Sequence, residues 1–179
     1  PGACEPVVQR VAERGPGDLV AARLPVVGGW PSATPAARLH AAARKSWPDY
    51  RDEVVATLAA IPSDAVLFVL LTLKDAQFAW NLARSLALDD DRTWSELAGA
   101  YEKVDPLAVL PVLTRLVENE LTEAGAQHYQ MAARRLAKMR KLAAGSNKAD
   151  DVDSFIAALR EAHRRRPRLQ QEFDRAGLP

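Results

Sequence analysis

The chain of 179 residues lacks most of what disulfide scaffolds, thiolate metal centres and membrane proteins are built from. Its single cysteine, Cys4, excludes an internal disulfide and a cysteine-ligated metal site. The most apolar stretch is uncharged only over residues 65–73, whereas a membrane-spanning helix needs about 20 apolar residues. These shortages predict a protein of a reducing, cytoplasmic compartment that does not interact with membranes.

Catalytic and cofactor motifs are also missing. No pair among His40, His128 and His163 has the spacing of metal ligands on a helix, and no phosphate-binding glycine loop or nucleophile-elbow motif occurs. The aspartates at 89–91 lack the glycine and the closing glutamate of a calcium loop. We therefore expect no cofactor, no metal and no enzymatic activity. These aspartates, and those at 150, 151 and 153, are expected to cap helices.

What the chain does contain is a series of helix start and stop signals, with 48% hydrophobic and 26% charged residues and a net charge of +1. They predict helices over 34–45, 46–60, 63–88 with a restart at Asp75, 92–104, 105–123, 126–144, 151–165 and 168–176. Ser46 and Ser63 are the expected caps of the second and third helices. Pro111 predicts a kink or a displaced helix start.

The run at 65–73 fits either a buried strand or a buried helix. No second run of this kind exists to pair with it, and a lone strand is unstable. We therefore assign it to a helix with Phe68, Leu71 and Leu82 in the core. The whole pattern predicts an all-α fold of antiparallel helical hairpins over 32–179, preceded by a loosely structured arm over 1–31 that carries two short helical segments, 7–14 and 19–24.

A repeat pattern is present in the second half of the chain. Trp94, Leu97, Ala98 and Tyr101 have the spacing that opens a tetratricopeptide repeat, with alanine at the usual glycine position. Thirty-five residues later, close to the 34-residue period, a similar set follows: Tyr129, Ala132, Ala133 and Leu136. The pattern predicts a tetratricopeptide-like short solenoid, and an irregular helical bundle remains the alternative.

The same half of the chain resembles the C-terminal helical region of bacterial, mainly actinobacterial, SWIM zinc-finger proteins. The resemblance covers about residues 75–178 and rests on Trp94, the segment 105–112, Tyr129, Arg135-Leu136 and the segment 163–167. The zinc site of that family is a C-x-C followed by C-x-H, which a chain with one cysteine lacks. The resemblance implies that this chain, which begins with Pro1, is a fragment whose zinc finger for nucleic acid or protein lies upstream. It implies no catalytic residue.

The most distinctive charge feature lies between Met131 and Arg168, where eleven basic and four acidic residues give a net charge of +7. If their side chains share one open face, they form a phosphate-binding surface. The candidate nucleic-acid or anion-binding residues are Arg134, Arg135, Lys138, Arg140, Lys141, Arg164, Arg165, Arg166 and Arg168. The alternatives are a solvated or ion-paired face, in which Glu118, Glu120 and Glu123 of the neighbouring helix pair with them, and a site for an acidic protein partner.

The leading functional hypothesis is a non-catalytic protein–protein interaction module, a scaffold or adaptor that forms part of a larger protein. A helical solenoid binds peptides or proteins in a groove, here expected between the first helices of successive hairpins. The alternative is a nucleic-acid-binding accessory domain that uses the C-terminal basic face. That alternative requires the basic side chains to converge, and it fails if most of them are scattered or paired with carboxylates.

Overall fold

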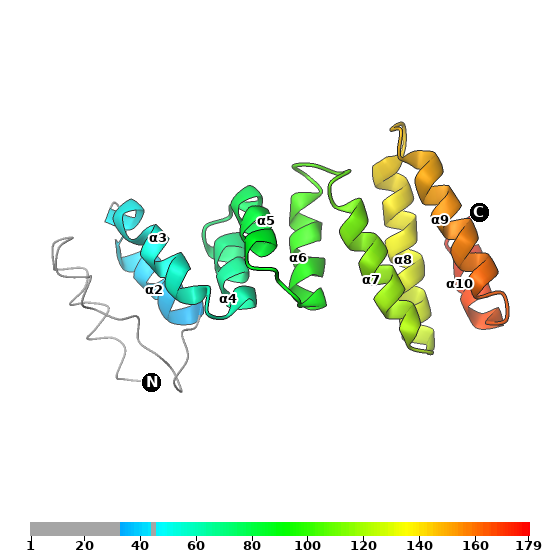
Figure 1. The fold of residues 1–179 in the computed structure, drawn as a ribbon, viewed down its shortest axis with the longest axis horizontal. Coiled ribbons are helices and arrows are strands. Elements are labelled where there is room, and N and C mark those ends of the chain that lie inside the picture. The colour runs from blue at the N-terminus through cyan, green and yellow to red at the C-terminus, as the bar shows by residue number, and fades with distance from the viewer. Residues whose placement is uncertain (1–32, 44–45) are drawn as a thin grey trace. The chain divides into compact units, whose positions relative to one another are not determined.

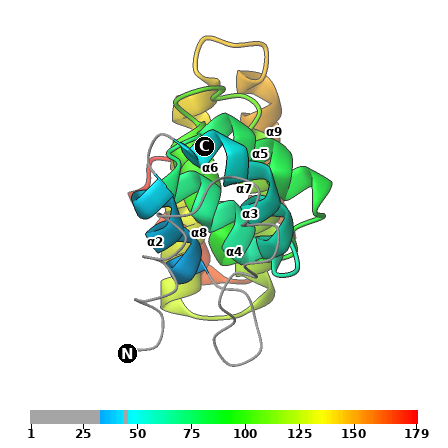
Figure 2. The same ribbon diagram turned by 90° about the vertical axis from the view of Figure 1, so that its left-hand side faces the viewer.

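The computed structural model describes residues 33–43 and 46–179, and every regular element within them is a helix (Figures 1 and 2). The all-α prediction is therefore confirmed for this part of the chain. The expected arm over 1–31, with its two short helical segments and Cys4, lies outside the described residues.

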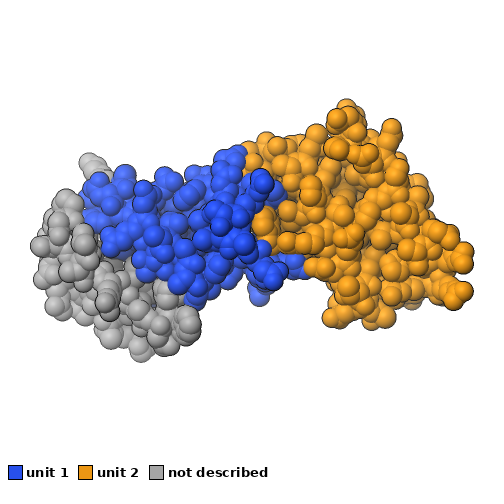
Figure 3. Space-filling view, in the orientation of Figure 1, with its two compact units in different colours: residues 1–93 blue, residues 94–179 orange. Residues whose placement is uncertain are grey.

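The chain divides into two compact units, residues 1–93 and 94–179, where the sequence suggested one helical domain over 32–179 (Figure 3). The boundary falls inside a helix, α6, between Thr93 and Trp94. The composition of the chain does not reveal this domain boundary, because no glycine- or proline-rich segment lies near Thr93.

The described part of unit 1, residues 33–43 and 46–93, contains four α-helices and one π-helix before α6. They are α2 (Ala33–Ala43), α3 (Trp47–Leu58), α4 (Pro62–Leu67), the π-helix η3 (Phe68–Thr72) and α5 (Ala76–Ser85). α4 packs against α3 and α5. The core between them is aromatic and aliphatic, with Trp47, Leu58, Phe68 and Trp80 buried.

The helix caps predicted for unit 1 are confirmed in part. Asp75 caps α5 as predicted, because its carboxylate accepts a hydrogen bond from the Phe78 N–H at 2.8 Å. Ser46 occupies the N-cap position of α3, although its side chain makes no capping hydrogen bond. The prediction that Ser63 caps the next helix was wrong: α4 already begins at Pro62, whose fixed φ suits the first helical position.

The run at 65–73 is helical, as predicted, but it changes from α to π geometry at Phe68. Phe68 lies in the core, whereas Leu71 is 61% exposed and Leu82 only half-buried, so the expected burial of Leu71 was wrong. A π turn is wider than an α turn. Because it contains more residues per turn, it rotates the chain less per residue than an α-helix does, so Leu71 lies farther from the direction of the buried Phe68 than the α spacing predicts, out of the core.

Unit 2 is organised around one long helix. It contains the larger part of α6 (Asp91–Tyr101), then α7 (Leu110–Thr122), α8 (Ala126–Ala143), α9 (Ala149–Ala162) and α10 (Pro167–Arg175). α8 packs most extensively against α7 and also contacts α9 and α10. Its central residue Leu136 is completely buried, as are Ile156 of α9 and Phe173 of α10.

The helix ends of unit 2 follow proline and glycine. Pro111 displaces the start of α7 to Leu110, one of the two outcomes predicted for it. Gly145 and Gly177 stand after α8 and α10 with φ of +75° and +64°, a conformation that glycine adopts without strain. Asp150 and Asp151 lie in the first turn of α9, not at its cap, because the helix begins at Ala149.

Both sets of tetratricopeptide-like positions are buried. Trp94, Leu97, Ala98 and Tyr101 line the inner face of α6, and Tyr129, Ala132, Ala133 and Leu136 that of α8. Burial of these positions is expected in a solenoid and in an irregular bundle alike. The tetratricopeptide-like arrangement of hairpins therefore stays a prediction.

A candidate protein-binding pocket between α7 and α9

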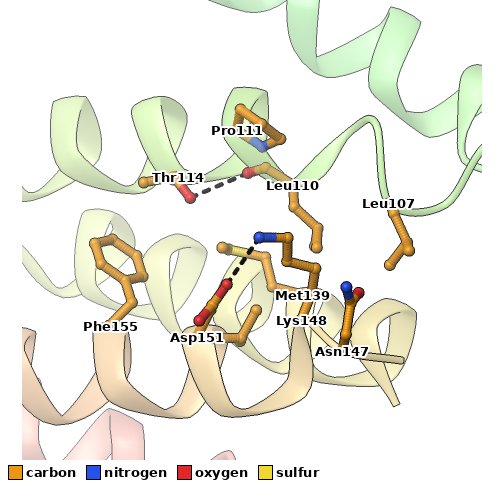
Figure 4. A pocket seen from close by; sticks show the side chains of 10 residues that line it. Leu107, Leu110, Pro111, Thr114, Met139, Asn147, Lys148, Asp151 and Phe155 are labelled. Carbon is orange, nitrogen blue, oxygen red and sulfur yellow. Dashed lines mark hydrogen bonds and ion pairs between the residues drawn. The ribbon is translucent and has the colours of Figure 1, made fainter. Parts of the chain in front are cut away.

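An apolar recess of unit 2 lies between α7 and α9, at the level where α8 ends (Figure 4). Its volume is about 270 Å³. α7 and the turn before it supply one wall, α9 and the α8–α9 turn supply the other, and Met139 of α8 lies between them. The lining residues are Leu107, Leu110, Pro111, Thr114, Met139, Asn147, Lys148, Asp151, Val152 and Phe155.

Two turns hold the walls of this pocket. Before α7, the Asp105 carboxylate accepts hydrogen bonds from the N–H groups of Leu107 at 3.1 Å and Ala108 at 3.0 Å. After α8, the Ser146 hydroxyl donates to the Ala143 carbonyl at 2.7 Å and accepts from the Lys148 N–H at 3.1 Å. Short polar side chains of this kind stabilise turns through their own backbone contacts. The walls are therefore fixed by local hydrogen bonds on both sides.

The polar groups of the pocket lie at its mouth. The Lys148 ammonium forms an ion pair with Asp151 at 2.9 Å, and both side chains are more than half exposed. In Figure 4 a dashed line joins the ammonium to the Asp151 carboxylate, and the Met139 side chain lies beside them. The Thr114 hydroxyl donates to the Leu110 carbonyl at 3.0 Å, so it is already satisfied within α7. No nucleophile–base pair faces the cavity among its lining residues, and the arrangement suits apolar binding rather than chemistry.

The size of the pocket limits its ligand. Sites for small molecules and cofactors usually enclose about 300–1,000 Å³ and cover most of the ligand. A pocket of about 270 Å³ that opens to solvent is small for such a ligand but large enough for an apolar side chain. Interfaces between proteins commonly use such a pocket for one buried anchor residue.

A second pocket, in unit 1, has a volume of about 390 Å³ and a more polar lining. His40 packs edge-on against Trp47 with ring centroids 4.7 Å apart, and Asp75 caps α5. The Arg51 guanidinium lies over the Phe78 ring at 4.5 Å. These side chains stabilise the fold, so this pocket is the weaker candidate.

Most of the predicted basic site residues are paired with carboxylates. Five of the nine form ion pairs: Arg135 with Glu120 at 2.5 Å, Lys138 with Glu102, Arg140 with Asp153 at 2.7 Å, Arg164 with Glu161 at 2.9 Å and Arg168 with Glu172 at 3.3 Å. Arg166 instead donates to the Leu121 carbonyl of α7 at 2.9 Å. Ion pairs of this kind reduce the charge available to phosphates.

Three of the predicted residues have no partner within the part of the chain that the structure describes. Arg134 and Lys141 are exposed on α8, and Arg165 is exposed in the turn between α9 and α10. The pairing predicted from the glutamates of the neighbouring helix occurs at Glu120 but not at the other two. Glu118 is exposed and has no partner among the described residues, and Glu123 lies against His128 instead. The basic segment is therefore largely an ion-paired face, and two of the cations on α8 make no ion pair with residues 33–43 and 46–179.

Sequence reasoning found no histidine paired with a carboxylate, yet His128 lies between two of them. Its Nδ1 is 2.8 Å from Glu120 and its Nε2 is 3.2 Å from Glu123. The turn between α7 and α8 brings these groups together, and the eight-residue separation of His128 and Glu120 is the only signal the sequence offers. Because the two ring nitrogens face different carboxylates, the cluster joins two helices and does not offer convergent metal ligands.

His163, which follows α9, has a shifted pKa. Burial lowers the pKa of His163, and the nearby Arg166 lowers it further.

Among residues 33–43 and 46–179 no group of three or more histidine, cysteine, aspartate and glutamate side chains is placed to hold a metal ion. In that same part of the chain, no helix is both long and apolar enough to cross a membrane.

The pocket itself was missed at the level of residues. A groove was expected between the first helices of successive hairpins, which the repeat pattern places at 92–104 and 126–144. Only Met139 comes from these segments; α7 and α9 supply most of the lining. The positions Leu107, Pro111 and Phe155 carry no motif, and only the packing of the helices brings them together.

Comparisons of this chain with protein-family models, with curated proteins and with solved structures find no match. The resemblance to the SWIM zinc-finger proteins therefore stays a prediction.

Proposed function

We propose that this chain is a non-catalytic protein-interaction module and that the pocket between α7 and α9 receives an apolar side chain of a protein or peptide partner. The observation that supports this function is the apolar recess of about 270 Å³ with its polar groups at the mouth. An apolar anchor gains about 25 cal/mol for each Å² of surface that it removes from water. The ion pair at the mouth offers polar contacts for the peptide backbone beside that anchor.

The nucleic-acid alternative has no comparable support. Proteins that bind nucleic acid through phosphates commonly use about 6–10 basic contacts. Here the ion pairs leave Arg134, Lys141 and Arg165 as the unpaired members of the predicted set.

The test is a selection from a displayed library of random peptides, followed by fluorescence anisotropy with the enriched peptides. We expect the enriched sequences to share one large apolar residue, because the pocket offers one apolar site. Thr114→Trp places an indole in the pocket from the middle of α7. It should weaken binding at least about tenfold, which corresponds to about 1.4 kcal/mol.

The matched control is Thr122→Trp, which adds the same indole at the exposed C-terminal end of α7, away from the pocket lining. Its hydroxyl bonds only to the Asn119 carbonyl, at 2.6 Å. Leu107→Asp, in the turn before α7, is a second pocket variant that does not alter a helix. The proposal fails if no peptide is enriched, or if both pocket variants bind the enriched peptides as tightly as the Thr122→Trp protein does.

A further inference from the structure

The side of α8 that faces away from the core carries a stripe of basic and apolar side chains. We define the α8 stripe as Met131, Arg134, Lys138 and Lys141, which recur at spacings of three, four and three residues. Residues at these spacings lie on one face of a helix. The buried residues of α8, among them Ala133 and Leu136, occupy the opposite face.

Two of the four stripe residues are unsatisfied cations. Arg134 and Lys141 are exposed and, among the described residues, have neither a carboxylate nor a carbonyl partner, whereas Lys138 forms an ion pair with Glu102. Seven residues separate the two free cations, so they stand about 10 Å apart along the helix. The stripe therefore offers two charges at a fixed spacing, with its middle cation already neutralised.

The stripe also contains exposed apolar surface. Met131 is 41% exposed, and Val104, two residues beyond the Glu102 that bonds Lys138, is 53% exposed. They are the large apolar side chains that unit 2 exposes among its described residues. Methionine adapts its shape to a partner and is common at binding surfaces. A partner that binds here can therefore use apolar contacts as well as charge.

This combination favours an acidic protein segment over nucleic acid as the occupant. Two free cations neutralise too few phosphates for stable binding to a duplex, and Glu102 would repel the backbone. An exposed methionine gains nothing from phosphates, but it gains from contact with an apolar side chain. An amphipathic helix that carries carboxylates and an apolar side chain on one face complements both features.

We propose that the α8 stripe docks an acidic amphipathic helix of a partner protein, with carboxylates opposite Arg134 and Lys141 and an apolar side chain on Met131. This surface differs from the pocket between α7 and α9, because the lining of that pocket contains none of the four stripe residues. The inference does not depend on the function proposed for the pocket.

The probe is a fluorescein-labelled helical peptide with two glutamates seven residues apart and a leucine three residues before the first of them. Its matched control has the same composition, with the glutamates moved to opposite faces. A single-stranded oligonucleotide of similar length is the third ligand. Anisotropy is measured with the full chain at about 50 and 200 mM salt, the range over which phosphate contacts lose affinity steeply.

We expect the probe to bind more tightly than its control. The double variant Arg134→Glu/Lys141→Glu should weaken probe binding at least about tenfold, since two attractions become repulsions. Met131→Ser should weaken it about threefold without altering the salt dependence. Arg165→Glu, which changes an exposed and unpaired arginine outside the stripe, should have little effect.

Thr114→Trp should leave probe binding unchanged, so failure of the pocket proposal and failure of this one are distinguishable. The proposal is overturned if the probe and its control bind equally, or if neither binds. It is also overturned if the oligonucleotide binds more tightly than the probe, through Arg134 and Lys141 but independently of Met131. That last result would identify a polyanion surface instead.

Discussion

The contact between α7 and α8 depends on a cluster of charges, and Glu120→Ala tests how much that cluster stabilises unit 2. The Glu120 carboxylate accepts a hydrogen bond from Arg135 Nη1 at 2.5 Å and lies 2.8 Å from His128 Nδ1. The side chains of Glu120 and Arg135 are only 19% and 17% exposed. Removing Glu120 leaves Arg135 with the Leu116 carbonyl as its remaining partner, at 3.2 Å.

The expected loss lies between two known limits. Breaking a fully buried ion pair costs about 3–5 kcal/mol, and an exposed pair is worth about 0–1 kcal/mol. Side chains that are four-fifths buried fall between these limits, so we expect the free energy of unfolding to drop by about 2 kcal/mol. Alanine is a better helix former than glutamate, which offsets a few tenths of a kcal/mol, about 0.4 at most.

The assay is urea unfolding followed by circular dichroism at neutral pH, with Glu118→Ala as the control. Glu118 lies on the same helix, exposed and unpaired, so its replacement carries the same helix-propensity gain and should change stability by less than about 0.5 kcal/mol. A double-mutant cycle with Arg135→Met should give a coupling energy of at least about 0.5 kcal/mol. Equal unfolding midpoints for the Glu120 and Glu118 variants would refute the reasoning.

Two further predictions concern the cap of α6 and the core. Asp90 accepts hydrogen bonds from the hydroxyl and the N–H of Thr93, which lower the pKa of its carboxyl below the ordinary 3.8, the hydroxyl contributing most. Asp90→Ala should cost about 1 kcal/mol at neutral pH. Because the folded-state pKa of Asp90 is lowered, this stabilisation is present above pH 3.8 and is lost as the pH falls through the folded-state pKa. The thermal unfolding curves of the wild-type and Asp90→Ala proteins should therefore converge in acid. A difference in unfolding temperature that stays constant with pH would contradict this prediction. In urea unfolding, Leu136→Ala should lower the free energy of unfolding by about 2–5 kcal/mol, because the Leu136 side chain is buried. Leu71→Ala should lower it by less than about 0.5 kcal/mol, because Leu71 is exposed. Equal losses for the two variants would disprove the assigned burial.

Local signals in the sequence determined where most helices begin and end. Asp75 caps α5, Gly145 and Gly177 follow α8 and α10, and Pro111 moves the start of α7. Each of these effects depends on backbone geometry within a few residues, which a sequence displays directly. The helical nature of the run at 65–73 also followed from the sequence, because the sequence contains no second apolar run that could pair with it as a strand.

Other features depended on contacts between distant residues. A π-helical turn exposes Leu71. The packing of unit 2 brings Glu120 into contact with Arg135 and His128, whereas Glu118 has no partner among the described residues. Sequence composition alone gave these glutamates the same expected role. Successive side chains of an α-helix point about 100° apart around its axis. The two glutamates therefore differ in role because only Glu120 points from α7 toward α8.

The sequence by itself therefore determined the all-helical fold and the charge surplus of the C-terminal segment, because both depend on composition and short-range periodicity. Only the tertiary structure decided which of those charges are neutralised and which remain free. It also placed Leu107, Met139 and Phe155 around one pocket. The physical reason is that a pocket or an ion pair exists only where helices distant in sequence pack together, and their relative rotation is set by the core that they share.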